Sequence, residues 1–417
     1  MLPRLLEGVG ELPMATLEAH ESVHGPPPDL GRIRPADLIR LVEQSGLRGR
    51  GGASFPMARK LHAVASRRGP KVVVVNGTEG EPASKKDRML LRELPHLVLD
   101  GSAIAARAIG ASEAIIAVAE SDERSVASLE RAMGERWDAG LRDEPQFELV
   151  VIRDGFVSGQ ETALVSALSG EEAKPTFGQR PFERGVRRLP TLVQNAETVT
   201  HLALIARHGS HWFRELGPPG DPGSRLLTLA GALGAPGVYE IETGMPLADL
   251  LELARVEDGL AAVLVGGYFG AWVPAAFVAD LTLSNEHLGS CGAGLGAGVI
   301  VALSDVTCAV AETARVADYL AAASAGQCGP CVHGLAAIAD TVQRLACGTA
   351  PAGALGEVER WASELRGRGA CQHPDGAARF VASAVRAFTE EFRDHARRGP
   401  CKRCAGTPVL PTPIPVG

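Results

Sequence analysis

Helix-like and strand-like hydrophobic patterns alternate along the first half of the chain. Apolar residues recur at helical spacing over 37–45, and the β-branched run KVVVV at 71–75 is typical of a strand buried on both faces. The alternation continues with helical patterns at 95–109, at 123–136 and from about Glu161, and with strand-like segments at 114–120 and 147–155. This βαβα order predicts a mostly parallel sheet with helices on its faces. We therefore expect an α/β, Rossmann-like domain over residues 30–215.

The second half predicts two further regions and a tail. A turn-rich linker, GPPGDPGSR, precedes two strand-like pieces and a helix, which suffice for a small β-grasp-like domain at 225–300. The pattern is then helical, giving a helical domain at 305–397. Residues 398–417 have no core-forming pattern, and we expect a flexible tail.

Composition and charge narrow the class of protein. The length of 417 residues predicts two or three domains. A net charge of −7 without a long basic run argues against nucleic-acid binding. The N-terminus lacks the apolar core of a signal peptide, and no stretch approaches the ~18 apolar residues of a membrane span. We expect a cytoplasmic protein without membrane insertion, in which the eight cysteines are metal ligands, redox groups or core residues.

A glycine-rich run lies between the first helix and the first strand: Gly49-Arg50-Gly51-Gly52-Ala-Ser54-Phe55-Pro56. Its backbone amides could approach a phosphate, and Lys60 could neutralise it. The run is not a Rossmann fingerprint, because a helix precedes it and Ser54 stands at the third glycine. Taken alone, it favours a structural turn.

Polar residues follow the predicted strands where an open α/β sheet places its ligand crevice. Glu79 and Glu81 come after the first strand together with Asn76, and they could hold a ribose, line a nicotinamide site, act as acid and base, or form a solvated loop. The segment SGQETA at 158–163 opens a helix, so its amides suit a ligand or only a cap. The same two interpretations apply to Gln194, Asn195 and Thr198.

Cysteines cluster near the C-terminus. Cys328 and Cys331 in GQCGPC have the spacing of a cluster iron, a zinc or a redox dithiol, and Cys371 could complete the set. Cys401 and Cys404 form a second CxxC that could bind metal, shuttle redox equivalents or stay idle. Sequence context favours inert packing for the remaining three, which are Cys291, Cys308 and Cys347.

Together these motifs resemble the NADH-binding flavoprotein subunit of respiratory complex I and its relatives in NAD-reducing hydrogenases and formate dehydrogenases. The resemblance is collinear from about residue 37 to 397. It is carried by GLRGRGGASFPMARK, NGTEGEPASKKDR, SGQETAL, RLPTLVQNAETV, GVYEIETGMPL and GQCGPC followed by GACQ. It implies that the β-grasp domain is of the SLBB type and that the helical domain carries an iron–sulfur site.

The resemblance also implies non-covalent FMN with NADH stacked on it. Positions matching the flavin contacts are Gly49, Gly51, Asn76, Gln194, Asn195 and Thr198, with Phe156 where the family has an aromatic. Gly52 belongs to the same cofactor-binding loop. Arg50, Phe55 and Lys60 would serve NADH. Glu79, Glu81 and Glu161 would surround the nicotinamide as the catalytic set, and the metal ligands would be Cys328, Cys331 and Cys371.

The chain departs from the family pattern at several positions. Ala325 replaces the first cluster cysteine, which leaves an open iron, a three-iron cluster, a fourth ligand from Cys401, Cys404 or Cys347, or loss of the cluster. Further replacements of family residues are Thr78 for Asp, Ser54 for Gly, Gln160 for Glu and Ala63 for an aromatic.

The leading hypothesis is an FMN-dependent NADH dehydrogenase. Electrons would pass through a 4Fe–4S or incomplete cluster to a redox partner: a ferredoxin-like or thioredoxin-like iron–sulfur protein, a quinone-reductase complex or a membrane reductase. One alternative is a flavin-linked dithiol–disulfide oxidoreductase in which Cys328 and Cys331 cycle without a cluster. The other is a non-catalytic scaffold. Acidic residues near the ribose would favour NADH over NADPH.

Overall fold

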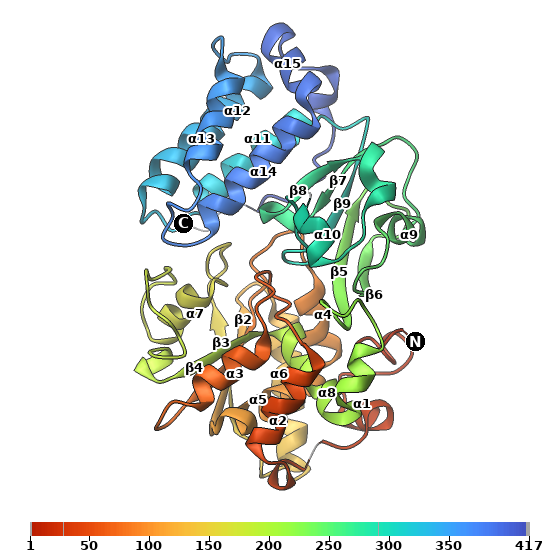
Figure 1. Cartoon of the computed structure of the whole chain (residues 1–417), viewed down its shortest axis with the longest axis vertical. Helices are drawn as coiled ribbons and strands as arrows, with labels where there is room; N and C mark the ends of the chain where they lie inside the picture. Colours follow the sequence, from red (N-terminus) through yellow and green to blue (C-terminus); the bar gives the residue numbers. More distant parts are fainter. Residues whose placement is uncertain (1, 28, 291, 414–417) are drawn as a thin grey trace.

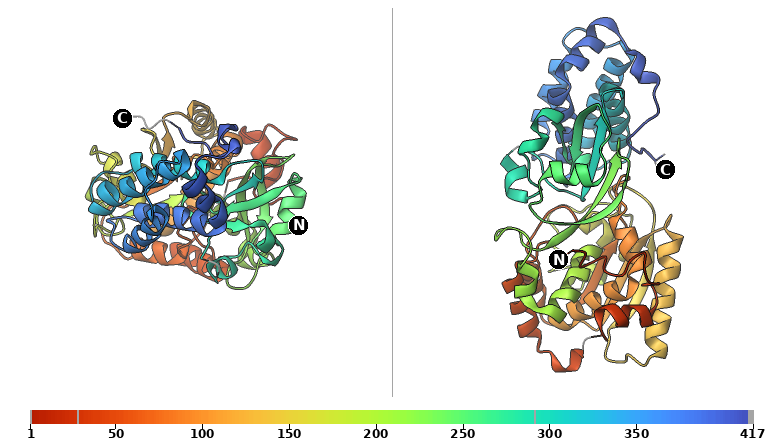
Figure 2. Two further views of the ribbon diagram at one scale, coloured as in Figure 1. Left: turned by 90° about the horizontal axis from the view of Figure 1, so that it is seen from above. Right: turned by 90° about the vertical axis from the view of Figure 1, so that its right-hand side faces the viewer.

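Three regions follow one another along the chain in the computed structural model, which describes residues 2–27, 29–290 and 292–413 (Figure 1). An α/β domain with a parallel sheet comes first, a mixed sheet follows, and helices form the C-terminal region. Figure 2 shows the α/β domain at one end of an elongated molecule and the helical region at the other. This arrangement confirms the predicted fold class.

Four parallel strands form the sheet of the α/β domain, in the order β3-β2-β1-β4. They are β1 (Val72–Gly77), β2 (Glu113–Ala119), β3 (Gln146–Ile152) and β4 (Thr191–Asn195). Val72 to Val75 of β1 have no exposed surface, as their continuous apolar run predicted. Because the strands are parallel, their carboxyl ends meet at one edge of the sheet, which faces the other two regions in Figure 1.

Helices cover both faces of this sheet. Val73 and Val75 pack in the larger apolar cluster, together with α2, α3, α5 and α8, whereas Val72 and Val74 face the smaller cluster with α7. The helices of the domain are α1 (Leu17–His24), α2 (Pro35–Ser45), α3 (Met57–Ala65), α4 (Lys86–Glu93), α5 (Pro95–Ile109), α6 (Glu123–Asp138), α7 (Glu161–Leu168) and α8 (Ala196–Arg214). The first of them precedes residue 30, and its Ala19 packs in the larger apolar cluster.

The second sheet is mixed, with strand order β6-β5-β9-β7-β8. Its strands are β5 (Ser224–Gly231), β6 (Gly237–Glu242), β7 (Leu260–Val265), β8 (Ala271–Pro274) and β9 (Val299–Ser304). The first strand, β5, pairs with the last, β9, in parallel, and the remaining pairs are antiparallel. Two short helices, α9 (Leu247–Leu253) and α10 (Asn285–Ser290), accompany the sheet.

The C-terminal region is helical. It contains α11 (Ala309–Ala322), a π-helical turn (Pro330–Leu335), α12 (Ala336–Cys347), α13 (Ala354–Glu364), α14 (His373–Ala387) and α15 (Thr389–Arg398). Their apolar faces form one cluster with Tyr268 and Trp272 of the mixed sheet. This shared core fixes the helical region against that sheet.

The C-terminal segment expected to be a flexible tail makes contacts with the protein as far as Pro411. Leu410 is 1% exposed, and the carboxylate of Glu312 in α11 accepts its backbone N–H at 2.9 Å. The hydroxyl of Tyr268 donates to the carbonyl of Pro411 at 2.6 Å. The sequence pattern missed this because the segment adds Leu410, Val409 and several backbone hydrogen bonds to a core built by other parts of the chain.

None of the described helices has the length and apolar character needed to span a bilayer. The expected cytoplasmic location stays a prediction.

Candidate functional site

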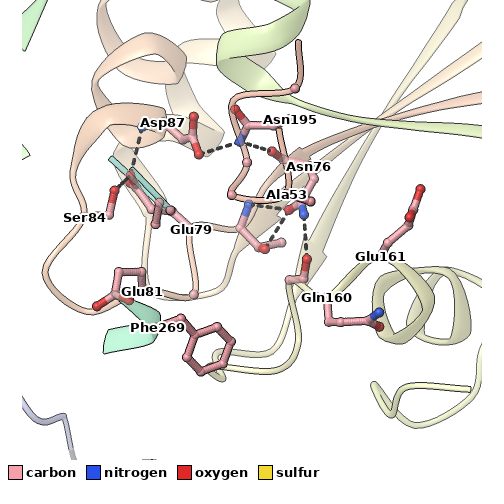
Figure 3. A pocket seen from close by; sticks show the side chains of 18 of the residues that line it. Ala53, Asn76, Glu79, Glu81, Ser84, Asp87, Gln160, Glu161, Asn195 and Phe269 are labelled. Carbon is pink, nitrogen blue, oxygen red and sulfur yellow. Dashed lines mark hydrogen bonds between the residues drawn. The ribbon is translucent and has the colours of Figure 1, made fainter. Parts of the chain in front are cut away.

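A cavity of about 790 Å³ opens at the carboxyl ends of β1 and β4. Its lining comes from all three regions: the glycine-rich loop, the turn after β1, the start of α7, the end of β4, the turn at 266–269, and α14. Figure 3 shows labelled side chains from the α/β domain on several sides of it, with Phe269 of the mixed-sheet region nearby. Its size and concave shape are those of a cofactor site.

Side-chain amides at the ends of β1 and β4 form a connected network. Asn76 donates from Nδ2 to the carbonyl of Gly159 at 2.7 Å, and its Oδ1 accepts from the Thr78 hydroxyl at 2.8 Å. Asn195 donates from Nδ2 to Asp87 at 2.7 Å (Figure 3). Its Oδ1 accepts the backbone N–H of Glu197 at 3.1 Å. Asn195 therefore caps α8 and also lines the cavity, and its contact with a ligand stays a prediction.

Gln194 differs from these neighbours. It is 4% exposed and lines the cavity, and its Nε2 is buried without a hydrogen-bond partner in the described part of the chain. A buried amide donor without a partner costs free energy, about 1–3 kcal/mol. A ligand acceptor in the cavity would remove this cost.

The glycine-rich loop forms one wall. The N–H of Gly49 donates to the carbonyl of Phe55 at 2.9 Å, closing the loop, and the N–H of Arg50 donates to the Thr198 hydroxyl at 2.9 Å. A Cβ added at Gly51 would lie 3.1 Å from that of Asn195, and Gly52 has φ of 120°. The loop thus needs glycine for close approach and for its backbone conformation.

Arg50 corrects one sequence expectation. Its guanidinium does not line the cavity but points toward the start of the second sheet, where it donates to the carbonyls of Pro222 and Ser224 at 3.2 and 3.0 Å. Asp221 lies 3.6 Å away. These acceptors hold the side chain in the interface between the two regions, so Arg50 is not placed to contact NADH.

Lys60 and Glu161 form an ion pair at the cavity. The ammonium lies 2.8 Å from the carboxylate and also donates to the carbonyl of Val193 at 3.2 Å. Both side chains are partly exposed, so a ligand can reach them. Gln160, next to Glu161, accepts the N–H groups of Thr162 and Ala163 and caps α7.

The two acidic residues after β1 have different surroundings. The carboxylate of Glu79 accepts from the Ser84 hydroxyl at 2.6 Å and from the backbone N–H groups of Asp87 and Arg88 at 3.0 Å. Its side chain is 2% exposed, so Glu79 is the cap of α4 and not a residue of a solvated loop. Its position matches capping better than catalysis.

Glu81 accepts the backbone N–H of Tyr268 through Oε2 at 3.0 Å, while its Oε1 is buried without a partner in the described part of the chain. Burial raises the pKa of Glu81 to about 8, an effect that hydrogen bonds from the backbone of Tyr268 and Ala83 only partly oppose. The carboxyl is therefore protonated at neutral pH and can donate a hydrogen bond into the cavity.

An aromatic wall of Phe156, Phe269 and His373 borders the cavity, which Phe156 and Phe269 line. Phe156 lies edge-on to Phe269 and to His373, with ring centroids 4.9 and 5.6 Å apart. His373 bonds the carbonyl of Leu320 at 2.7 Å. Gln372 lines the cavity, and Cys371 and His373 are its neighbours in the chain.

Cys328, Cys331 and Cys371 lie near one another. Burial and the nearby Cys328 and Cys371 raise the pKa of the Cys331 thiol to about 12. Cys328 and Cys331 flank the start of the π-helical turn, and Cys371 lies just before α14. Ala325, where the family has a cysteine, lies in the loop between α11 and Cys328.

The proposed sources of a fourth ligand are not beside this trio. Cys401 and Cys404 lie instead with Cys308 and His395. Cys347 is exposed at the far end of α12, whose 12 residues span about 18 Å. Cys291 lies outside the described residues.

The cavity contains residues that the sequence motifs did not single out. Lys86 forms buried ion pairs with Asp87 and Glu197 at 2.8 and 2.9 Å. Other such residues come from the second and third regions: Gly266, Phe269, Gly296, Gln372 and Arg379. Lys86 and Gln372 lie inside the family motifs NGTEGEPASKKDR and GACQ, which gave these two residues no role of their own. The segments of the other residues carry no such motif, and only the tertiary fold brings them to the sheet edge.

The FMN implied by the motifs fits the residues present. The loop offers backbone amides without side chains in the way, and Gln194 offers an unused buried donor. The side chains predicted to contact cofactor or substrate line the cavity, apart from Arg50. Acceptor-rich FMN suits a cavity of this chemistry.

Comparisons with known proteins agree with this geometry. Residues 42–204 match the family model described as the Nuo51 FMN-binding domain, and residues 311–395 match the NADH-ubiquinone oxidoreductase-F iron-sulfur binding region. One subunit of an NADH-quinone oxidoreductase of Rhizobium meliloti is 32% identical over 387 residues, which cover 89% of this chain and 91% of that protein.

A mitochondrial NADH dehydrogenase [ubiquinone] flavoprotein 1 from Dictyostelium discoideum is 30% identical, over 87% of this chain and 79% of its own length. A crystal structure of an NAD+-reducing [NiFe]-hydrogenase in the H2-reduced state superposes with a TM-score of 0.83 at 29% identity, covering 96% of this chain and 67% of the other.

Proposed function

The chain belongs to the family of FMN-binding, iron–sulfur-containing flavoprotein subunits of NADH dehydrogenases, and from this premise we propose roles for its individual residues. The protein is an FMN-dependent oxidoreductase that oxidises NADH and transfers electrons through an iron–sulfur cluster. The family supports the cluster hypothesis over the cluster-free dithiol and the scaffold. FMN supplies hydride acceptance and single-electron release when bound.

The residues proposed to hold FMN are those at the sheet edge. The backbone N–H groups of Gly51 and Gly52 would bind its phosphate, because those of Gly49 and Arg50 already donate within the protein. The free Nε2 of Gln194 would donate to an acceptor on the ring system. Asn76, Asn195 and Thr198 would act mainly by fixing that edge, because their side chains already hydrogen-bond to neighbouring segments. The unpartnered, buried Gln194 amide is the observation that carries this proposal.

NADH would enter beside the Lys60–Glu161 pair and Phe55. Lys60 would bind a phosphate or ribose oxygen of the dinucleotide, and Glu161 would hold the ammonium in place. Protonated Glu81 would donate a hydrogen bond at the nicotinamide end. Glu79 would act only as a positioning residue, through the cap of α4.

The aromatic wall would define where electrons leave. We infer that Phe156 and His373 lie between the cavity and the cluster, because Phe156 lines the cavity, packs against His373, and His373 is two residues from Cys371. Together they would exclude water from this path. Cys328, Cys331 and Cys371 would hold the cluster, each binding a different iron. Val332, next to Cys331, is 46% exposed, and we propose that a ferredoxin-like or thioredoxin-like iron–sulfur protein docks at this surface.

Anaerobic purification in the presence of excess FMN tests the proposal. We expect the protein to retain FMN together with iron and acid-labile sulfide, and the flavin absorbance to bleach on addition of NADH. A protein that retains neither FMN nor iron under these conditions would refute it.

A further inference from the structure

Four ligand side chains converge at the end of the helical region distant from the cavity wall. The atoms are Sγ of Cys308, Cys401 and Cys404 and Nε2 of His395, and they all lie within 4.8 Å of one another. Cys308 and His395 are 2% and 1% exposed, respectively. We propose that these four residues bind one zinc ion, separate from the iron–sulfur cluster, which fastens the C-terminal segment to the protein.

The distances match a single tetrahedral ion. Zn–S bonds of ~2.3 Å and a Zn–N bond of ~2.0 Å at tetrahedral angles imply S···S separations of about 3.8 Å and S···N separations of about 3.5 Å. The Sγ of Cys404 lies 3.7 Å from that of Cys401 and 3.4 Å from that of Cys308. Nε2 of His395 lies 3.5 Å from Sγ of Cys308 and 3.9 Å from Sγ of Cys404.

The ligand set favours zinc over a second cluster. Three thiolates and one imidazole make the closed set of structural zinc sites, with no position left for substrate. Ligand atoms surrounding one point leave room for one ion, whereas a cluster needs its cysteines distributed around several irons. Zn²⁺ has no redox chemistry, so the ion would take no part in electron transfer.

The site is separate from the predicted cluster. Cys308 precedes α11, and the loop with Ala325 and Cys328 follows the other end of that helix. The 14 residues of α11 place these two ends about 21 Å apart. Cys308 and His395 therefore cannot supply the cluster ligand that Ala325 lacks.

A second set of contacts joins the segments that carry the ligands. Glu391, one turn before His395, accepts the N–H of Ala309, which follows Cys308, at 2.9 Å. The guanidinium of Arg403, between the two tail cysteines, lies 3.0 Å from Glu391 and donates to the carbonyl of Asp305 at 2.7 Å. Such partners orient ligands in metal sites, and the cation of Arg403 offsets the charge of three thiolates.

The ion would anchor a strap that ends near the flavin cavity. Beyond Cys404 the chain runs along α11, where Glu312 accepts the N–H groups of Val409 and Leu410 at 3.2 and 2.9 Å. The strap then reaches Tyr268 through the carbonyl of Pro411. Tyr268 lies in the turn at 266–269, and its backbone N–H donates to Glu81. Zinc at one end of this strap would thus steady a turn that lines the cavity.

Elemental analysis of the full chain, purified anaerobically with FMN and its cluster, tests the proposal. We expect equimolar zinc in addition to iron, and zinc-edge X-ray absorption showing three sulfur ligands and one nitrogen. In the variant Cys401→Ser/Cys404→Ser, zinc should fall by at least about tenfold while FMN and iron stay, because two of four ligands are gone. Cys347→Ser, which removes an exposed cysteine on α12, is the matched control and should keep its zinc.

Hydrogen exchange gives a readout that does not depend on activity. The backbone amides of Val409 and Leu410 should exchange faster in the double variant, whereas those of β1 should not change. Should the double variant fail to fold, the zinc-edge X-ray absorption spectrum of the unaltered protein still tests whether three sulfur ligands and one nitrogen bind zinc. The proposal is overturned by zinc-free protein from zinc-supplied cells, by zinc that survives the double substitution, by iron at this site, or by a Cys401–Cys404 disulfide in the purified protein.

Discussion

The carboxyl of Glu81 accepts the backbone N–H of Tyr268 at 3.0 Å and thereby joins the parallel-sheet domain to the mixed-sheet region beside the cavity. The other oxygen of Glu81 has no partner among the described residues. Tyr268 in turn donates its hydroxyl to Pro411. One buried, protonated carboxyl therefore connects the cavity, the second sheet and the C-terminal strap.

Glu81 should make stability depend on pH. An unfolded glutamate loses its proton near pH ~4.3, whereas burial raises the pKa of folded Glu81 to about 8. Folding takes up a proton between these values, so this residue's contribution to the free energy of unfolding should fall as pH rises from about 4.3 to 8, by up to ~1.4 kcal/mol per pH unit. Glu81→Gln should lose this dependence in chemical unfolding experiments.

Glu359→Gln, at an exposed position on α13, is the control for this experiment and should unfold with the same pH profile as the unaltered protein. A Glu81→Gln variant whose profile also matches the unaltered protein would show that Glu81 titrates normally.

Replacing Gln194 by Leu should weaken FMN binding. Leucine is similar to glutamine in volume but lacks the amide donor that Gln194 offers to the cavity. We expect the Kd for FMN to rise about 10–100-fold, which corresponds to the loss of one buried hydrogen bond. Fluorescence titration of the deflavinated protein with FMN measures this directly. Gln343→Leu, on the surface of α12, should leave the Kd unchanged. Equal affinities in all three proteins would exclude a contact between Gln194 and the flavin.

Lys60→Ala should raise the KM for NADH, by about tenfold, because a charge-assisted hydrogen bond at the cavity is lost. The flavin content should not change, since the loop amides are intact. His62→Ala, on the same helix but with an exposed side chain, is the comparison. A large loss of FMN from the Lys60 variant, with normal KM in the remaining holoenzyme, would assign Lys60 to the flavin instead.

Ala325→Cys should complete a four-cysteine set with Cys328, Cys331 and Cys371. The expected result is a higher ratio of iron to protein after aerobic handling, because every cluster iron then has a protein ligand. Ala323→Cys, two residues earlier in the chain, should not have this effect. Iron contents that do not differ between the two variants would mean that the loop at 325 does not face the cluster.

Much of the fold follows from local patterns. The alternation of apolar runs and helical faces predicted the parallel sheet, and the fully buried valines of β1 are its clearest case. The family resemblance assigned Asn76 and Gln194 to one flavin site, and both line the cavity. The apolar patterns alone did not predict β4 as a strand, so they could not bring Gln194 to the end of β1. The role of Glu79 was less accessible, since its backbone partners belong to the next helix.

Contacts between regions were beyond the sequence patterns. Arg50 was expected to reach NADH, but carbonyls from the linker to the second sheet bind it instead. Phe269 and Gln372 enter the cavity from regions folded separately along the chain. Cys308 was expected to be an inert core residue because its neighbours in the sequence are small or apolar. Its neighbour in the structure, His395, is 87 residues away, and no sequence motif has that spacing.

Anaerobic titration of the holoprotein with NADH, followed by optical and electron paramagnetic resonance spectroscopy, tests the proposed electron path most directly. We predict that NADH bleaches the flavin and that a reduced iron–sulfur signal then develops in the same sample without any added mediator. An oxidised cluster that persists beside fully bleached flavin, or a flavin that NADH leaves unchanged, would contradict electron transfer from the cavity through the aromatic wall to Cys371 and its partners.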